Sequence, residues 1–325
     1  MTAAESPPPA QLARTVLAGR AVSPAEALGL LQLSGDQRYE LLHWAQRICL
    51  ARLGRQVRCC SIASARTGRC PEDCRFCAQS ARYRTPAQPR VAPPEELLAA
   101  GDAARAQGAH CFGLVASGPA AADHEIDRLA PVIRHLAGRG GLECCASLGC
   151  LTAAQAGRLR ALGVLRYNHN LETSRRFFGH VVTTHSYDDR LATLRQARQA
   201  GLKLCSGGII NLGETLQDRV DLALSLRELD VDTVTINFLN PIPGTPLADR
   251  PSLPPLTALQ TVAMFRFVLP DKHIMIAGGR EKCLRDLQSW MFYAGASGCI
   301  LGHYLTTPGR PAAADLQMLR DLELL

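Results

Sequence analysis

The chain has 325 residues, 47% of them hydrophobic, and a formal net charge of +7, so it is long enough for a barrel domain of about 250 residues around one core. Its basic residues are scattered and only 5% of residues are aromatic, which argues against a nucleic-acid-binding surface. It has no run of about 18 apolar residues and no hydrophobic signal core, so we expect a cytoplasmic protein without a membrane segment. Because disulfides are rare in the reducing cytosol, we expect its 13 cysteines to serve metal or cluster ligation.

The N-terminal part is predicted to be helical before the catalytic domain begins. Residues 1–22 are polar and contain several prolines, and we expect a flexible lead-in there. Ser23 and Pro24 suit the N-cap and the first position of a helix, and Leu28, Leu31 and Leu33 supply its apolar face. We therefore expect a helical cap over residues 23–56.

From residue 57 to residue 310, short apolar runs alternate with segments of helical period. Strands are expected near 57–63, 110–116, 142–148, 164–169, 202–206, 231–237, 272–276 and 297–301. Helices are expected at 95–107, 152–162 and 187–200, each before a glycine, and others from residues 216, 258 and 284. This alternation predicts an α/β fold, a (β/α)8 TIM-type barrel with an N-terminal helical extension and a C-terminal helical tail over 311–325. An open doubly wound sheet is the alternative, but neither a G-x-G-x-x-G motif nor a P-loop follows the first strand.

A compact C-x3-C-x2-C loop, formed by Cys70, Cys74 and Cys77, follows the first predicted strand. Three thiolates at this spacing can hold three irons of a 4Fe-4S cubane and leave the fourth iron without a protein ligand. S-adenosylmethionine can chelate that iron through its amino and carboxylate groups, so we assign the three cysteines as metal ligands of a catalytic loop. A structural zinc site is the alternative, but zinc sites usually close with four ligands and this loop has no fourth.

Several strings resemble the biotin synthase family of the radical S-adenosylmethionine superfamily. The superfamily signature is the cysteine loop, here Cys-Pro-Glu-Asp-Cys at 70–74 followed by Cys-Ala-Gln-Ser at 77–80. The family strings are Tyr-Asn-His-Asn-Leu-Glu-Thr at 167–173, Cys-Ser-Gly-Gly-Ile at 205–209, Gly-Glu-Thr at 213–215 and Gly-Thr-Pro-Leu at 244–247. The resemblance runs from about residue 40 to residue 308. It implies a sulfurtransferase that uses deoxyadenosyl radicals to insert sulfur into dethiobiotin and form biotin.

The same resemblance implies roles for residues outside the loop. Ligands of an auxiliary iron–sulfur cluster that supplies the sulfur are implied at Cys111, Cys145 and Cys205. Contacts with S-adenosylmethionine are implied for Phe76 at the adenine, Asn170 and Glu172 at the ribose, and Arg190 at the carboxylate. Contacts with the substrate are implied for Asn168, Asn170 and Asn237. His169 should point away from the ligands if side chains alternate, and we assign it a structural role.

One position departs from the family. In the best-studied relatives an arginine on the seventh strand is the fourth ligand of a 2Fe-2S auxiliary cluster, and Met275 aligns with it. A thioether is a weak, neutral ligand and does not imitate guanidinium. Alternate barrel strands contribute to one interior layer, which groups Cys145, Cys205 and Met275 with Cys60 of the first strand. We hypothesise that Cys60 is the fourth protein ligand of a 2Fe-2S or larger cluster. A one-residue register error would select neighbouring thiols instead, namely Cys59, Cys144 or Cys150.

Radical chemistry implies an electron donor, a flavodoxin or a ferredoxin, and iron–sulfur assembly proteins. The relatives are homodimers, so we also expect a homodimer.

Three other functions stay open. One is another small-molecule radical enzyme on a related barrel, such as a hydrogenase-cofactor maturase, which lacks the auxiliary cysteines. The second is a non-catalytic iron–sulfur redox sensor, which needs no pocket of Asn170, Glu172 and Asn237. The third is a nucleic-acid-binding zinc protein.

Overall fold

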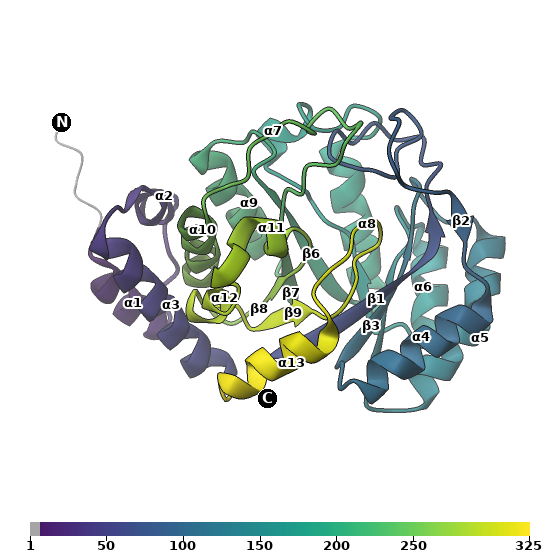
Figure 1. Cartoon of the computed structure of the whole chain (residues 1–325), viewed down its shortest axis with the longest axis horizontal. Coiled ribbons are helices and arrows are strands. Elements are labelled where there is room, and N and C mark those ends of the chain that lie inside the picture. Colours follow the sequence, from purple (N-terminus) through teal and green to yellow (C-terminus); the bar gives the residue numbers. More distant parts are fainter. Residues whose placement is uncertain (1–6) are drawn as a thin grey trace.

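The fold is a closed barrel of eight parallel strands surrounded by helices (Figure 1). The computed structural model describes residues 7–325. Hydrogen-bonded neighbours follow the order β1-β3-β4-β5-β6-β7-β8-β9, and the pairing of β9 with β1 closes the cylinder. The predicted (β/α)8 barrel is confirmed, and the open doubly wound sheet is wrong. The strands are β1 (Arg58–Thr67), β3 (Cys111–Ala116), β4 (Glu143–Ser147), β5 (Arg166–Asn168), β6 (Lys203–Ile210), β7 (Thr233–Phe238), β8 (His273–Ile276) and β9 (Gly298–Ile300).

The predicted strands agree with these eight in number and place. Two of them are longer than expected, because β1 continues to Thr67 and β6 to Ile210. An additional short strand, β2 (Arg90–Val91), pairs antiparallel with the end of β1 and was not predicted.

Helices cover the outside of the barrel, and side-chain caps set the N-terminal starts of several of them. Thr152 caps α6 and Ser186 caps α8, each by accepting a hydrogen bond from a backbone N–H of the first turn. The principal outer helices are α4 (Pro94–Ala106), α5 (Asp123–Gly138), α6 (Ala153–Leu162), α8 (Tyr187–Gln199), α9 (Leu216–Glu228) and α10 (Pro255–Val268). None of the helices within residues 7–325 is long and apolar enough to cross a bilayer.

The helix predicted from residue 284 is wrong. A short helix ends there instead, because Arg285 takes a positive φ of 51°, which interrupts the helical backbone. The segment consists of three short pieces, α11 (Arg280–Leu284), the 3-10 turn η1 (Arg285–Leu287) and α12 (Trp290–Tyr293). A further short helix, α7 (Arg175–Phe178), lies between β5 and α8, and α13 (Ala312–Asp321) forms the C-terminal tail.

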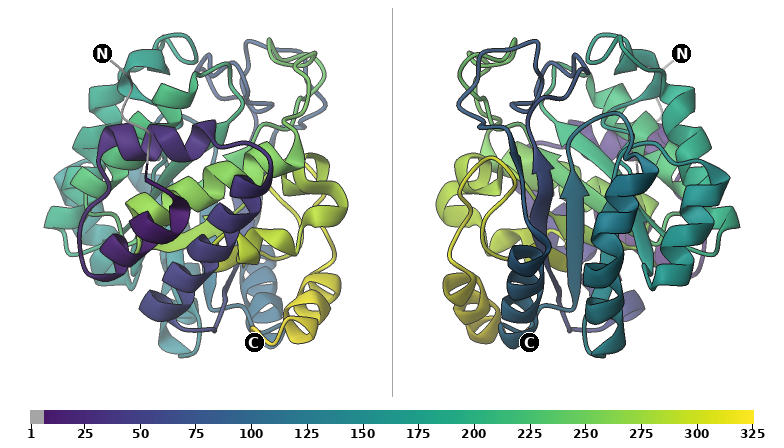
Figure 2. Two further views of the ribbon diagram at one scale, coloured as in Figure 1. Left: turned by 90° about the vertical axis from the view of Figure 1, so that its left-hand side faces the viewer. Right: turned by 90° about the vertical axis from the view of Figure 1, so that its right-hand side faces the viewer.

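Three helices precede the barrel. Ser23 and Glu26 form a capping box at the start of the second, as the Ser-Pro start predicted. The expectation of a flexible lead-in is wrong for residues 9–17, which form a helix that packs on α3 through buried Leu12 and Val16; residues 1–6 lie outside the described part. Figure 2 shows these purple helices lying over α10 on one side of the barrel. They are α1 (Pro9–Leu17), α2 (Pro24–Gln32) and α3 (Asp36–Leu53).

Alternation along the strands separates an outward from an inward set of cysteines. Cys59, Cys144 and Cys299 belong to the main hydrophobic core between the sheet and its helices. Cys60 belongs to a separate small cluster inside the barrel, where it packs with Met275. A one-residue register error is therefore excluded on β1 and β4, and Cys60 and Met275 share the interior as predicted.

Candidate active site

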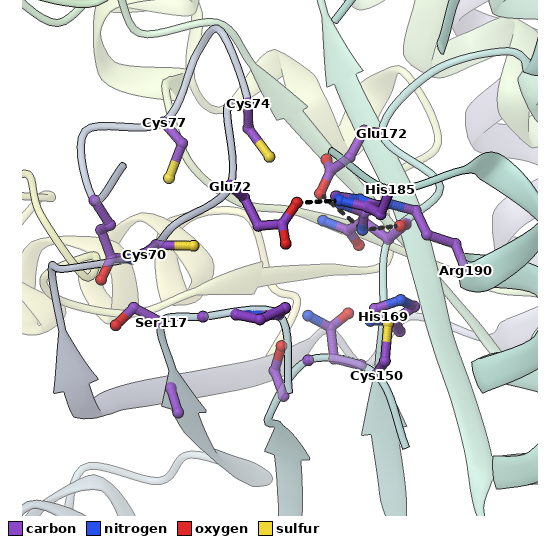
Figure 3. Close-up of a pocket in the computed structure, with 18 of the residues that line it drawn as sticks. Cys70, Glu72, Cys74, Cys77, Ser117, Cys150, His169, Glu172, His185 and Arg190 are labelled. Carbon is purple, nitrogen blue, oxygen red and sulfur yellow. Dashed lines mark hydrogen bonds and ion pairs between the residues drawn. The ribbon is translucent and has the colours of Figure 1, made fainter. Parts of the chain in front are cut away.

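The three loop cysteines lie in the connection from β1 to β2, at the carboxyl end of the barrel. The loop closes on itself through backbone hydrogen bonds, with the Cys70 N–H donating to the Gln79 carbonyl over 3.0 Å. Figure 3 shows the sulfurs of Cys70, Cys74 and Cys77 directed into one space. Within residues 7–325 no three His, Cys, Asp or Glu side chains converge on a single-ion site, a geometry that a cubane does not require because each thiolate binds a different iron.

The loop thiols lie in a poorly solvated environment. Burial raises the pKa of Cys77 to about 11, and it also raises the pKa of Cys74. Such thiols keep their protons until a metal replaces them, since the thiolate is the ligand. The donor set therefore fits an iron–sulfur cluster that is loaded with release of protons.

Hydrogen bonds fasten the cluster loop to residues 183–185, which precede α8; we call residues 72–73 and 183–185 the loop latch. Asp73 accepts from the N–H groups of Thr183 (2.9 Å) and Thr184 (3.3 Å), and Glu72 Oε2 lies 2.6 Å from His185 Nδ1. Burial alone would raise the pKa of Asp73, but the hydrogen bonds from Thr183 and Thr184 outweigh it and lower the pKa to about 2. The latch thus contains an ionised carboxylate, and Glu72 faces the cavity beside it (Figure 3).

The opposite wall of the cavity consists of Asn168, the last residue of β5, and the segment that follows it. Four of its buried polar atoms have no hydrogen-bond partner among the described residues: Asn168 Oδ1, His169 Nε2, Asn170 Oδ1 and Glu172 Oε2. Buried polar atoms are rarely left unpaired in native proteins, so this wall fits a polar ligand. Glu172 also has a φ of 68°, a costly backbone conformation that concentrates at functional sites.

Arg190 joins this wall to the loop latch. Its Nη1 donates to the Asn170 carbonyl over 2.7 Å and lies 3.6 Å from Glu172 Oε1. Its Nε donates to His185 Nε2 over 3.1 Å. Burial raises the pKa of Glu172 although Arg190 opposes the shift. Arg190 is therefore a buried cation of the cavity wall, able to face an anionic ligand group.

Two adjoining cavities occupy the mouth of the barrel. The first, of about 210 Å³, is lined by the cluster-loop cysteines and by Phe76, Asn170, Glu172 and Arg190. The second, of about 370 Å³, is lined by Asn237 and also by Phe76, Cys77, Asn168, Asn170 and Glu172, which it shares with the first. The residues predicted to contact the cosubstrate and the substrate thus line two cavities that share part of their walls.

Asn237 is already tied to the strand ends. Its Oδ1 accepts from the Gly278 N–H over 2.9 Å and its Nδ2 donates to the Gly208 carbonyl over 3.3 Å. An amide nitrogen carries two hydrogens, so one more hydrogen bond can be donated. The side chain is held rigidly at the wall of the second cavity.

Four cysteines face the barrel interior nearer the starts of their strands. Cys60 is in register with Cys111, and the thiols of Cys60 and Cys145 lie near enough to the Cys111 thiol to influence its pKa. The Cys205 sulfur lies 3.0 Å from the Thr235 hydroxyl, and Thr235 lines the second cavity. Burial raises the pKa of Cys205 to about 11. This interior thiol set consequently adjoins the second cavity.

Known proteins match the chain over nearly all of its length. Residues 65–226 match the Radical SAM superfamily, and residues 235–325 match the Biotin and Thiamin Synthesis associated domain. The biotin synthases of Geobacter metallireducens and Geobacter sulfurreducens are 49% and 48% identical to it, over 96% and 97% of this chain and equal shares of theirs. The chain belongs to the biotin synthase family.

Family membership confirms the resemblance drawn from the cysteine loop and its neighbouring strings. The superfamily match implies a 4Fe-4S cluster and S-adenosylmethionine, which the lining of the first cavity fits. Methylornithine synthase has the same fold, with a TM-score of 0.82 at 20% identity over 96% of this chain and 95% of that one. The hydrogenase maturase HydG of Carboxydothermus hydrogenoformans also has a TM-score of 0.82, at 18% identity over 98% of this chain and 78% of that one. These two likenesses establish the fold alone.

Sequence reasoning missed part of the first cavity. Glu72, Cys150 and His185 line it without having been assigned a role there. His169, to which a structural role was assigned, lines it too, because β5 ends at Asn168 and strand alternation does not continue beyond that residue. Burial lowers the pKa of His169, so its imidazole is neutral. The sequence offered one signal for Glu72, its place between two ligand cysteines, but none for its partner more than a hundred residues away.

Proposed function

We propose that the chain forms biotin from dethiobiotin by inserting sulfur between two unactivated carbons. The main observation in support is that the second cavity lies between the cluster-loop cavity and the interior thiols. A substrate bound in the second cavity can therefore reach both. When bound, the 4Fe-4S cluster reduces S-adenosylmethionine and supplies the 5′-deoxyadenosyl radicals that abstract hydrogen. Cys70, Cys74 and Cys77 would hold that cluster.

The chain's own residues would orient the two small molecules. Arg190 and Glu172 carry opposite charges into the first cavity, where they suit the carboxylate and the ribose hydroxyls of S-adenosylmethionine. Asn170 lines both cavities and would contact both ligands. Asn237 would donate its remaining N–H to the ureido carbonyl of dethiobiotin.

The sulfur source is proposed to be an auxiliary iron–sulfur cluster on Cys111, Cys145 and Cys205. Cys60 would be its fourth protein ligand, since it faces the same interior and is in register with Cys111, whereas Met275 beside it offers only a thioether. A cluster there would lie against the second cavity through Cys205 and Thr235. The donor set suits a 2Fe-2S or a larger cluster.

The remaining partners follow from the chemistry. One-electron reduction would come from a flavodoxin or a ferredoxin, and iron–sulfur assembly proteins would load both clusters. We also propose a cytoplasmic homodimer. Cluster loading and low-potential electron donors are available in a reducing compartment.

Anaerobic turnover with dethiobiotin, S-adenosylmethionine and a reductant tests the proposal. Biotin and 5′-deoxyadenosine should both form, and Cys77→Ala should abolish both because the radical-forming cluster loses a ligand. Deoxyadenosine without biotin would reject the substrate and keep the superfamily chemistry. Formation of neither product by cluster-loaded protein would favour a redox sensor.

The fourth auxiliary ligand is tested by Cys60→Ser, with Cys59→Ser as the matched control. Cys60→Ser should reduce the auxiliary iron content and change the auxiliary Mössbauer signal, because a hydroxyl is a poor substitute for a thiolate at iron. Cys59→Ser should leave both unchanged, since Cys59 packs in the outer core. An unchanged auxiliary signal in Cys60→Ser removes Cys60 from the ligand set.

A further inference from the structure

Arg166 is a buried cation inside the barrel that lines neither of the two cavities. It lies on β5 in register with Cys145 of β4. Two residues later on the same strand, Asn168 is in register with Cys205 of β6. The side chain of Arg166 is only 6% exposed. Arg166 therefore lies between the two strands that carry Cys145 and Cys205.

The charge of Arg166 is incompletely balanced. Its Nη1 lies 3.0 Å from Glu143 Oε2, but the same oxygen also accepts from Arg58 Nη2 over 2.8 Å. One carboxylate thus serves two guanidinium groups. In addition, the Arg166 Nε is buried and has no hydrogen-bond partner among residues 7–325. Burying a cation and leaving an N–H unpaired both cost free energy, so the arrangement points to an anion on this side of the barrel.

The interior thiols are the groups that can become that anion. Iron binding converts these thiols to thiolates, and bridging sulfides add further negative charge. Partners around a metal site that donate hydrogen bonds to its ligands orient them and tune the metal.

We propose that Arg166 is a positioning residue for the auxiliary cluster, donating its Nε–H to a cluster sulfur and balancing the charge of the thiolate ligands. The inference rests on the auxiliary cluster of the proposed function. Arg166 exchanges no atom or electron with the cluster. Because a nearby cation favours the more negative state, Arg166 makes the cluster easier to reduce and slows its loss.

The experiment uses the full chain reconstituted anaerobically, as wild type, Arg166→Gln and Arg58→Gln. Arg58→Gln is the matched control, because Arg58 binds the same carboxylate oxygen from the start of β1. Iron content, Mössbauer spectra, the auxiliary midpoint potential and the rate of iron loss to a chelator are measured. Arg166→Gln should lose auxiliary iron on the order of 10-fold faster and show a more negative midpoint potential, while the loop-cluster signal is unchanged. Arg58→Gln should resemble wild type.

A second variant keeps the test informative should Arg166→Gln fail to fold, which thermal unfolding will reveal. Arg166→Lys retains the charge but lacks the Nε–H, so the midpoint potential should stay near that of wild type while iron loss quickens. Wild-type potential and iron retention in folded Arg166→Gln overturn the inference. Equal effects of Arg58→Gln and Arg166→Gln overturn it as well, since the role would then lie in Glu143. Absence of auxiliary iron from wild type overturns both the inference and the proposed function. A wild-type-like Arg166→Gln, or equal effects of Arg58→Gln and Arg166→Gln, would leave the proposed function intact.

Discussion

The carboxylate of Glu172 is aimed at the first cavity by a close backbone contact with Gly208. The Ile209 N–H donates to the Glu172 carbonyl over 2.9 Å, and Glu172 pairs with Gly208 in an isolated bridge. A Cβ on Gly208 would overlap with the Glu172 carbonyl oxygen, so a side chain there cannot be accommodated without movement of the backbone. This contact maintains the left-handed conformation of Glu172.

We predict that Gly208→Ala displaces Glu172 and lowers turnover on the order of 100-fold, which is the effect of a displacement of about 1 Å at a reacting site. Overpacking should also cost about 1–3 kcal/mol in the free energy of unfolding. Equilibrium binding of S-adenosylmethionine, turnover and thermal unfolding are the measurements. Gly157→Ala is the control, since Gly157 is exposed on α6 with open space around it, and it should stabilise by about 0.5–1 kcal/mol. Unchanged binding and turnover in Gly208→Ala would contradict the assignment.

At the scale of elements, the cluster loop depends on a segment far along the chain. The loop latch ties residues 72–73 to residues 183–185, and the Arg75 N–H adds a bond to the Val181 carbonyl over 3.1 Å. A short Cys-rich loop has little apolar surface of its own with which to hold a shape. The approach to α8 therefore serves as a second support for the cluster ligands.

Asp73→Ala is expected to loosen the cluster loop. The N–H groups of Thr183 and Thr184 lose their acceptor, so loop-cluster iron should be released to a chelator about 10-fold faster, while the auxiliary Mössbauer signal persists. The control is Asp127→Ala, which removes a surface carboxylate paired with Arg158 and should change neither cluster. Equal loop-iron release from Asp73→Ala and wild type would show that the latch does not support the ligands.

The boundaries of the helices show which local sequence signals are sufficient to predict where a helix begins or ends. The capping residues Ser23, Thr152 and Ser186 set helix starts that the sequence predicts, because a cap acts within one turn. The helix at residues 9–17 is not predicted from the sequence, since it has no side-chain cap and packs on α3. The break at Arg285 was also missed, because a non-glycine residue with positive φ has no reliable sequence signal.

At the scale of the whole molecule, the C-terminal tail is joined to the barrel by a buried ion pair. Arg280, which begins α11 after β8, hydrogen-bonds to Asp315 of α13, and both side chains are 0% exposed. Arg280 also donates from Nε to the Tyr304 hydroxyl over 3.2 Å, and Tyr304 lines the second cavity. The tail thus supports one wall of that cavity.

Removing one partner of this pair should be strongly destabilising. Asp315→Ala removes the buried carboxylate of Arg280 and leaves only the half-buried Glu281 carboxylate, at 3.5 Å from Nε, to balance its charge. We therefore expect a loss of about 3–5 kcal/mol in the free energy of unfolding. Asp321→Ala, an exposed site at the end of the same helix, should stay within about 0.5 kcal/mol of wild type. Denaturant unfolding of the three proteins measures the difference, and equal stability of both variants would contradict the role given to the pair.

The alternation of strands and helices, the cluster loop and the family can all be recognised from the sequence, because these depend on periodicity and on motifs confined to short segments. The sequence also groups Cys60 with Met275, since strand alternation and barrel layering follow simple rules. The contacts of Glu72 with His185 and of Arg166 with Glu143 become evident only in the folded barrel. Barrel closure brings together side chains from strands and loops that are distant along the chain. The resulting charge balance and unpaired polar atoms exist only after that closure.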